Sequence, residues 1–197
     1  LFKRVKVVER SRAALHEGRL RPVQYYYERH EDKEKLVIID FDWDKGEIKS
    51  TTGKKPWLLA SHPGTVDKML YHVLLMHDLS TGLRSVEYKI ADRGKFKTYR
   101  FQVIAEENLD TALGKFETLK IQRIRSDNKQ TQTFWCAPKL NYIPVRVDSE
   151  EKDGSITTAK LRKFSDWEPL ITTQDSENPL VSPTAKEISD GSLQHLD

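Results

Sequence analysis

The stretch 36–51, LVIIDFDWDKGEIKST, decides the fold class. Its first eight residues alternate, with Val37 and Ile39 on one face and Asp40 and Asp42 on the other, which is the two-residue period of a half-buried β-strand. The DKG that follows is a turn signal, and the residues after it return to a strand-like composition. This stretch therefore predicts an antiparallel hairpin.

The same period recurs along most of the chain. Further strands are expected at 1–10, 23–30, 84–92, 96–105, 115–125, 131–137, 142–149 and 155–164. Nine or ten strands joined by short turns indicate a mostly β protein, in which a long antiparallel meander curls into an open or half β-barrel.

One segment departs from this period. Apolar residues recur at helical spacing over 65–79, with Thr65 as a candidate N-cap, so one amphipathic helix is expected to cover the sheet. We expect a single domain over 1–165 and a polar, poorly ordered tail over 166–197, where Ser, Thr, Asp, Pro and Glu dominate. Because the sequence starts at Leu1 inside a strand-like run, we expect the natural N-terminus, with any signal peptide, to be missing.

Composition narrows the class of function. The 33 Lys and Arg residues and 30 Asp and Glu residues interleave and leave a net charge of +3, so the basic concentration typical of nucleic-acid binding is not found. No apolar run approaches the roughly 20 residues of a membrane-spanning helix.

The sequence contains no recognisable catalytic centre, no metal site and no cofactor motif. Asp40 and Asp42 share a strand face and could perform acid–base chemistry, but two solvated carboxylates without further ligands are the favoured interpretation. His72 and His77 lie about 140° apart around a helix, too far apart to bind one metal ion. The single cysteine, Cys136, is expected to be a small buried hydrophobic residue rather than a nucleophile. We therefore expect the protein not to be an enzyme.

Aromatic residues are the candidate binding residues. Large rings on the inner face of a curved sheet can line a cavity for an apolar ligand, or they can fill a packed core. Eight aromatic residues fall on the expected inner strand faces: Tyr25, Tyr27, Phe41, Trp43, Tyr88, Tyr99, Phe101 and Trp135.

Several motifs resemble a bacterial family catalogued as domain of unknown function 3108. That family has the order E-x-L-x-T-x-x-G-x-F, W-x-A-P and N-Y-x-P-V, with a G-x-x-x-P entry and a helical stretch further upstream. The matching segments here are GRLRP at 18–22, the helical segment at 66–79, YRFQV at 99–103, EENLDTALG at 106–114, FETLKI at 116–121, TFWCAP at 133–138 and LNYIPV at 140–145.

The resemblance covers most of residues 10–165 and implies an exported protein of Gram-negative bacteria, located in the periplasm or associated with the envelope. It implies no activity, cofactor or catalytic residue. The inferred architecture is also distantly similar to the periplasmic lipoprotein carriers, half-barrels with a helical lid that hold acyl chains. Two non-enzymatic functions stay open: a module that holds a lipid or another hydrophobic small molecule in an enclosed apolar cavity of several hundred Å³, or a structural protein with a packed core that contacts an envelope protein.

Overall fold

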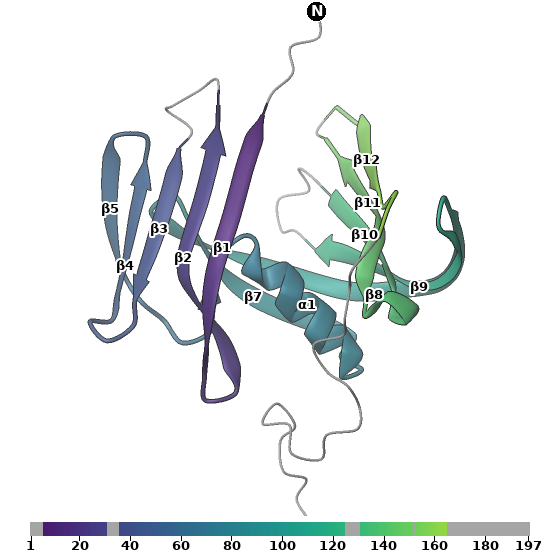
Figure 1. Ribbon diagram of the computed structural model, residues 1–197, viewed down its shortest axis with the longest axis horizontal. Coiled ribbons are helices and arrows are strands. Elements are labelled where there is room, and N and C mark those ends of the chain that lie inside the picture. Colours follow the sequence, from purple (N-terminus) through teal and green to yellow (C-terminus); the bar gives the residue numbers. More distant parts are fainter. Residues whose placement is uncertain (1–5, 31–35, 125–130, 152, 165–197) are drawn as a thin grey trace, which may run out of the picture.

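The computed structural model describes residues 6–30, 36–124, 131–151 and 153–164. Within these ranges the chain forms twelve strands, the α-helix α1 and the short 3-10 helix η2. The strands form two separate sheets, one of five strands and one of seven. Figure 1 shows the two sheets facing each other, with α1 between them.

The first sheet is an antiparallel meander in chain order. Its strands are β1 (Val7–His16), β2 (Arg19–Arg29), β3 (Val37–Asp42), β4 (Glu47–Thr52) and β5 (Lys55–Ala60). The expected hairpin is β3 and β4, in which Ile39 pairs with Ser50, and Gly46 supplies the positive φ of the turn at 67°.

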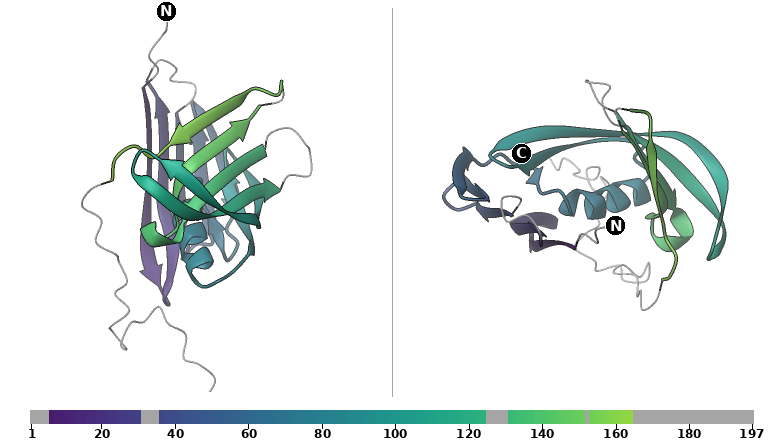
Figure 2. Two further views of the ribbon diagram at one scale, coloured as in Figure 1. Left: turned by 90° about the vertical axis from the view of Figure 1, so that its right-hand side faces the viewer. Right: turned by 90° about the horizontal axis from the view of Figure 1, so that it is seen from above.

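The second sheet is antiparallel except at one edge. Its strands are β6 (Thr65–Val66), β7 (Ser85–Asp92), β8 (Lys95–Thr111), β9 (Gly114–Ile124), β10 (Thr131–Ala137), β11 (Ile143–Glu150) and β12 (Ile156–Lys160). β6 runs parallel to β7, and the connection between them contains α1 (Leu70–Ser80). The helix η2 (Pro138–Leu140) joins β10 to β11. β8 and β9 form a long hairpin with a bulge between Val103 and Ala105, and bulges bend and twist a sheet. In Figure 2 the sheet curls around α1.

α1 lies in the interior of the fold rather than over an open end. Its sequence, LYHVLLMHDLS, carries apolar residues around most of its circumference, as is typical of a helix packed between two layers. Seen from above in Figure 2, the helix lies between β1 and the long strands of the second sheet.

Buried side chains form three clusters. The largest joins α1 to the concave face of β7–β10 and contains Tyr71, Leu75 and Phe101. A second cluster belongs mainly to the first sheet, and a third lies around Trp135 and Val145. The two sheets also touch at Gly94, where an added Cβ would lie 2.4 Å from the ring of Trp57.

The expected fold class is confirmed: the chain is mostly antiparallel β, open and curled, with one α-helix in the described residues. Three details differ. The meander divides into two sheets after β5, β5 itself was not expected, and Thr65 lies in β6 rather than capping the helix. The helix begins at Leu70 because Thr65 and Val66 pair with β7 first. The expected tail at 166–197 lies outside the described residues.

In the described ranges, no helix combines the length and the apolar character that crossing a membrane requires.

Candidate functional site

The candidate site is the space around α1, and Asp67 fixes the start of that helix. The Asp67 carboxylate accepts hydrogen bonds of 2.8 Å from the backbone N–H groups of Met69 and Leu70. It also accepts a 2.6 Å bond from the Ser11 hydroxyl on β1. Asp67 is fully buried, and burial raises the pKa of its carboxyl group in spite of these bonds. One side chain therefore caps the helix and joins the two sheets.

The face of α1 that points to the second sheet is aromatic and tightly packed. The Tyr71 ring stacks on Phe101 at 5.5 Å between centroids and meets Tyr99 edge-on at 5.4 Å. Further along the helix, Asp78 accepts a 2.5 Å hydrogen bond from the Tyr88 hydroxyl. Burial raises the pKa of both Tyr71 and Tyr88, so neither phenol ionises at neutral pH. This face anchors the helix.

The opposite face of α1 is partly open and carries a short apolar stripe, with the exposed polar residues His77 and Ser80 on the same side of the helix. Met69, Val73 and Met76 recur at i, i+4 and i+7, so they form one stripe along the helix. Met69 is 37% exposed and Val73 is 45% exposed, although both belong to a helix inside the fold. Since the buried face of the helix packs against the second sheet, the stripe lies on the side of α1 that is turned away from that packing.

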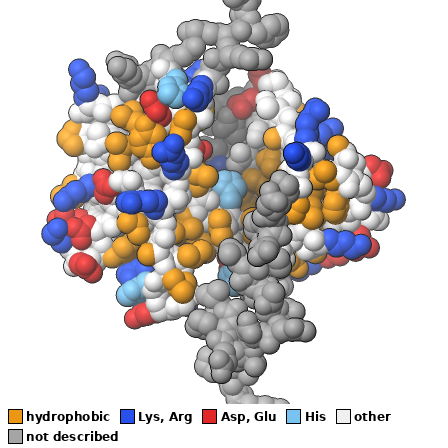
Figure 3. Space-filling model, viewed as in Figure 1, with side chains coloured by type: hydrophobic (Ala, Val, Ile, Leu, Met, Phe, Trp, Pro, Cys, Tyr) orange, Lys and Arg blue, Asp and Glu red, His pale blue; other side chains and the backbone are white. Residues whose placement is uncertain are grey.

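The surface on this side of the molecule is hollowed. Figure 3 shows hydrophobic side chains on both sides of the hollow between the two sheets. His72 lies beside the stripe, stacked on Tyr71 at 3.9 Å and edge-on to Phe134 at 6.3 Å. Burial lowers the pKa of His72, so the ring is neutral at pH 7. A neutral imidazole therefore lies beside the stripe.

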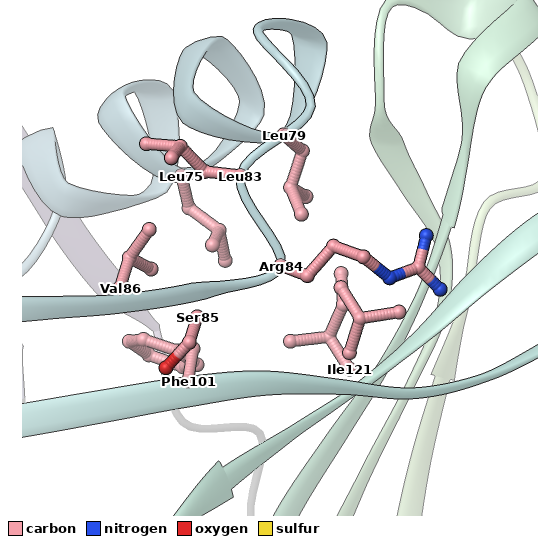
Figure 4. Close-up of a pocket in the computed structure, with 9 residues that line it drawn as sticks. Leu75, Leu79, Leu83, Arg84, Ser85, Val86, Phe101 and Ile121 are labelled. Atoms are coloured by element: carbon pink, nitrogen blue, oxygen red, sulfur yellow. The ribbon is translucent and has the colours of Figure 1, made fainter.

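A narrow crevice continues from the C-terminal end of α1 (Figure 4). It is too narrow to hold a water molecule. Leu75 and Leu79 point down from the helix toward Phe101 and Ile121 on the sheet. Leu83, which is 49% exposed, lies in the loop after the helix. The other lining residues are Arg84, Ser85, Val86 and Val103.

A basic side chain also lies on the concave face, in β9. The Arg123 guanidinium stacks on the Tyr99 ring, with Cζ 3.3 Å from the centroid. One of its terminal nitrogens donates a 3.2 Å bond to Gln132, but the buried Nε has no partner. The apolar interior therefore contains a cation with an unused donor.

The eight aromatic residues predicted as a lining do not surround one cavity. Tyr88, Tyr99 and Phe101 belong to the cluster beneath α1. The other five lie elsewhere: Tyr25, Tyr27, Phe41 and Trp43 in the cluster of the first sheet, and Trp135 in the third cluster.

Trp135 has a structural environment of its own. Its indole N–H donates to the Glu107 carboxylate, and the cationic groups of Lys120 and Arg146 lie 5.1 Å and 4.5 Å from its ring. It is 5% exposed, so this tryptophan packs β9–β11 rather than contacting the space around α1.

The lipid-holding alternative requires an enclosed apolar cavity of several hundred Å³, and neither of the two best-defined cavities has that form. One is the narrow crevice beneath α1, and the other is an open depression on the outside of the first sheet. The interior is filled by the aromatic cluster around Tyr71.

The groups considered for catalysis are occupied or buried. Asp40 accepts a 2.6 Å hydrogen bond from Gln24, and Asp42 accepts one of 2.8 Å from Lys45. Cys136 is fully buried, and burial raises the pKa of its thiol to about 12. Over the described ranges, no three His, Cys, Asp or Glu side chains are grouped to hold a metal ion.

The stripe on α1 was not singled out as a site from the sequence, although its signal is present. Met69 and Met76 are the two methionines of the chain, and both fall on the stripe. Methionine is flexible and polarisable and is frequent on surfaces that accept varied hydrophobic partners. The two methionines are seven residues apart in the helical segment, and this spacing could have indicated that they share one face of the helix.

Comparison with known proteins places the chain in a family context. A family model described as "Protein of unknown function (DUF3108)" matches residues 1–162. Neither the comparison with curated proteins nor that with solved structures finds a match. The similarity to lipoprotein carriers therefore stays a prediction.

Proposed function

The chain belongs to the DUF3108 family of proteins of unknown function, and we propose that it is a non-enzymatic binding module of the cell envelope. In this proposal the protein holds the hydrophobic chain of a lipid or similar small molecule against α1. The envelope location rests on the motifs that mark exported members of this family.

One observation carries the proposal: the stripe of Met69, Val73 and Met76 is apolar, partly exposed and placed between two sheets. A helix face left open in the interior of a fold exposes apolar area to water. At about 25 cal/mol per Å² of apolar surface covered, an alkyl chain lying along the stripe would be stabilised. Methionine side chains can adjust their rotamers to chains of different shape.

A second apolar space lies on the other side of the helix, in the crevice beneath its C-terminal end. Its walls are almost entirely apolar, and the guanidinium of Arg84 points away from it, toward an ion pair of 2.8 Å with Glu106. Leu83 closes the outer side and is half exposed, in a loop that follows Gly82 with a φ of 87°. Displacement of Leu83 would open this crevice toward solvent.

The absence of catalysis is supported by the state of the reactive groups. The Cys136 thiol is protonated at neutral pH, and the Asp40 and Asp42 carboxylates lie on the solvated outer region of β3, each with a hydrogen-bond donor. None of these three side chains lies beside the stripe.

A second function is favoured by a separate observation. The crevice cannot admit a water molecule and the aromatic cluster is closely packed, as in a structural protein that contacts an envelope protein through its surface. In that case the stripe of α1 would contact a protein rather than a lipid.

Mass spectrometry under native conditions separates the two functions. The protein, purified from bacterial envelopes without detergent, should carry a lipid mass that Val73→Gln reduces at least tenfold. A matched control is Leu58→Gln, which changes an apolar residue that is 62% exposed on β5, far from the stripe. Wild-type protein that carries no lipid, and takes none from vesicles, would leave the packed interaction protein as the function.

A further inference from the structure

The outer face of the first sheet contains a second cavity, unrelated to the stripe. Its volume is about 200 Å³, enough for several water molecules, and it is lined by Arg10, Arg12, Gln24 and Tyr26. Arg10 and Arg12 are two residues apart on β1, so their side chains leave the same face of the sheet. Across the pair, Arg10 lies opposite Tyr26 and Arg12 opposite Gln24.

This pairing places the four side chains at the corners of a rectangle. Residues two apart on a strand are separated by about 7 Å, and directly opposite residues have Cβ atoms about 5 Å apart. The two arginine side chains therefore leave β1 next to each other on one edge of the rectangle, and Tyr26 and Gln24 form the other edge.

Both guanidinium groups are free of ion pairs and hydrogen bonds within the part of the chain that the structure describes. Acidic residues are near, but other donors occupy them. The Tyr26 hydroxyl donates to Glu28 at 2.8 Å, and the Gln24 amide donates to Asp40 at 2.6 Å. The residues opposite the two arginines thus bond to the neighbouring acids, which keep their negative charge, and neither guanidinium is tied to them by an ion pair.

We propose that this cavity binds a phosphate group. A guanidinium offers a planar fork of N–H donors that matches the oxygens of phosphate, and two adjacent forks can bind one phosphate from two sides. The group would enter from solvent, since Arg10 and Arg12 are both exposed. The site is independent of the stripe on α1, so either proposal can fail without the other.

Phosphate occurs both in anionic lipid headgroups and in soluble molecules, and the experiment has one arm for each source. Flotation measures binding to vesicles of phosphatidylglycerol against vesicles of phosphatidylcholine, at low and at moderate salt. Phosphorus NMR measures binding of inorganic phosphate to the full chain. Binding in the first arm alone assigns the site to a membrane surface, and binding in the second assigns it to soluble phosphate as well.

The test variant is the double substitution Arg10→Gln and Arg12→Gln. Both residues are exposed, so the fold should be kept, which circular dichroism and thermal unfolding would verify. The control is Lys95→Gln with Lys115→Gln, which removes the same charge from exposed positions elsewhere. We expect the test variant to bind at least tenfold more weakly and the control to bind like wild type. Equal binding by both variants, or no binding by wild type in either arm, overturns the proposal.

Discussion

Removing the Asp67 carboxylate should loosen the contact between α1 and the first sheet. In Asp67→Ala, the N–H groups of Met69 and Leu70 and the hydroxyl of Ser11 lose their acceptor in a buried position. A lost helix cap costs about 1 kcal/mol, and a buried donor left without a partner costs about 1–3 kcal/mol. Water can enter the space of the lost side chain and bond to some of these donors, so we expect Asp67→Ala to lower the free energy of unfolding by about 3 kcal/mol in total.

The charge of Asp67 makes a separate, pH-dependent contribution. Burial raises its pKa in the folded protein, above the ordinary value of 3.8. As the pH rises from 3.8 toward the folded pKa, the unfolded chain loses this proton first, so folding stability falls across that window. Asp67→Asn keeps an acceptor oxygen but cannot ionise. The difference in stability between wild type and Asp67→Asn should therefore decrease as the pH rises through the window.

Urea unfolding followed by tryptophan fluorescence measures both effects. Asp110→Ala is the control, because Asp110 is an exposed carboxylate on β8; it should change stability by less than about 0.5 kcal/mol. The reasoning is refuted if Asp67→Ala is as stable as this control, or if wild type and Asp67→Asn differ by the same amount at every pH.

Three further predictions concern packing and charge. Asp92 is 2% exposed and pairs with Lys68 and Lys97. Burial alone would raise the pKa of its carboxyl group, but the two lysines hold that pKa below the usual value of 3.8, so the stability that Asp92 contributes is lost as the pH falls below 3.8. Asp92→Ala should therefore lower the free energy of unfolding in urea by about 3 kcal/mol at pH 7. Gly94→Ala should destabilise more than Gly154→Ala, because both glycines have positive φ but only Gly94 has a side chain within 3 Å of an added Cβ; equal melting temperatures would contradict this. The thiol of Cys136 should react with iodoacetamide at pH 8 only after denaturation. Rapid labelling of the native protein would show that this thiol is accessible to solvent.

The sequence indicates the strands because their period is local. Alternation along β3, β7 and β11 places apolar side chains on one face whatever the rest of the chain does. The same local signal failed for β5, whose sequence KPWLLA has a proline and no alternation; this strand is held by pairing with β4, which only the tertiary structure supplies.

The faces of residues in long strands could not be predicted in the same way. A bulge shifts the register by one residue, and every side chain beyond it changes face. Such irregularities lie between Val103 and Ala105 and between Trp135 and Cys136. Trp135 lies in a different cluster for a simpler reason: its neighbours Phe134 and Cys136 face the cluster beneath α1, so alternation along β10 turns Trp135 to the other face.

The position of α1 also depended on long-range information. Helical spacing over 65–79 predicted the helix, but not that it would lie between two sheets. Asp67 fixes the start of the helix, and its partner Ser11 is 56 residues away, so local spacing does not reveal this contact. The stripe became a candidate site only when the buried face of the helix was known.

The most direct test of the binding function uses the two methionines of the chain as probes. In protein labelled with ¹³C at the methionine methyl groups, Met69 and Met76 give one signal each, assigned by Met69→Leu and Met76→Leu. Titration with a fatty acid below its micelle concentration should shift both signals in a saturable way, and Val73→Gln should weaken the effect. If both methyl signals stay in place while the fatty acid concentration passes through the millimolar range, the stripe on α1 does not bind hydrophobic chains.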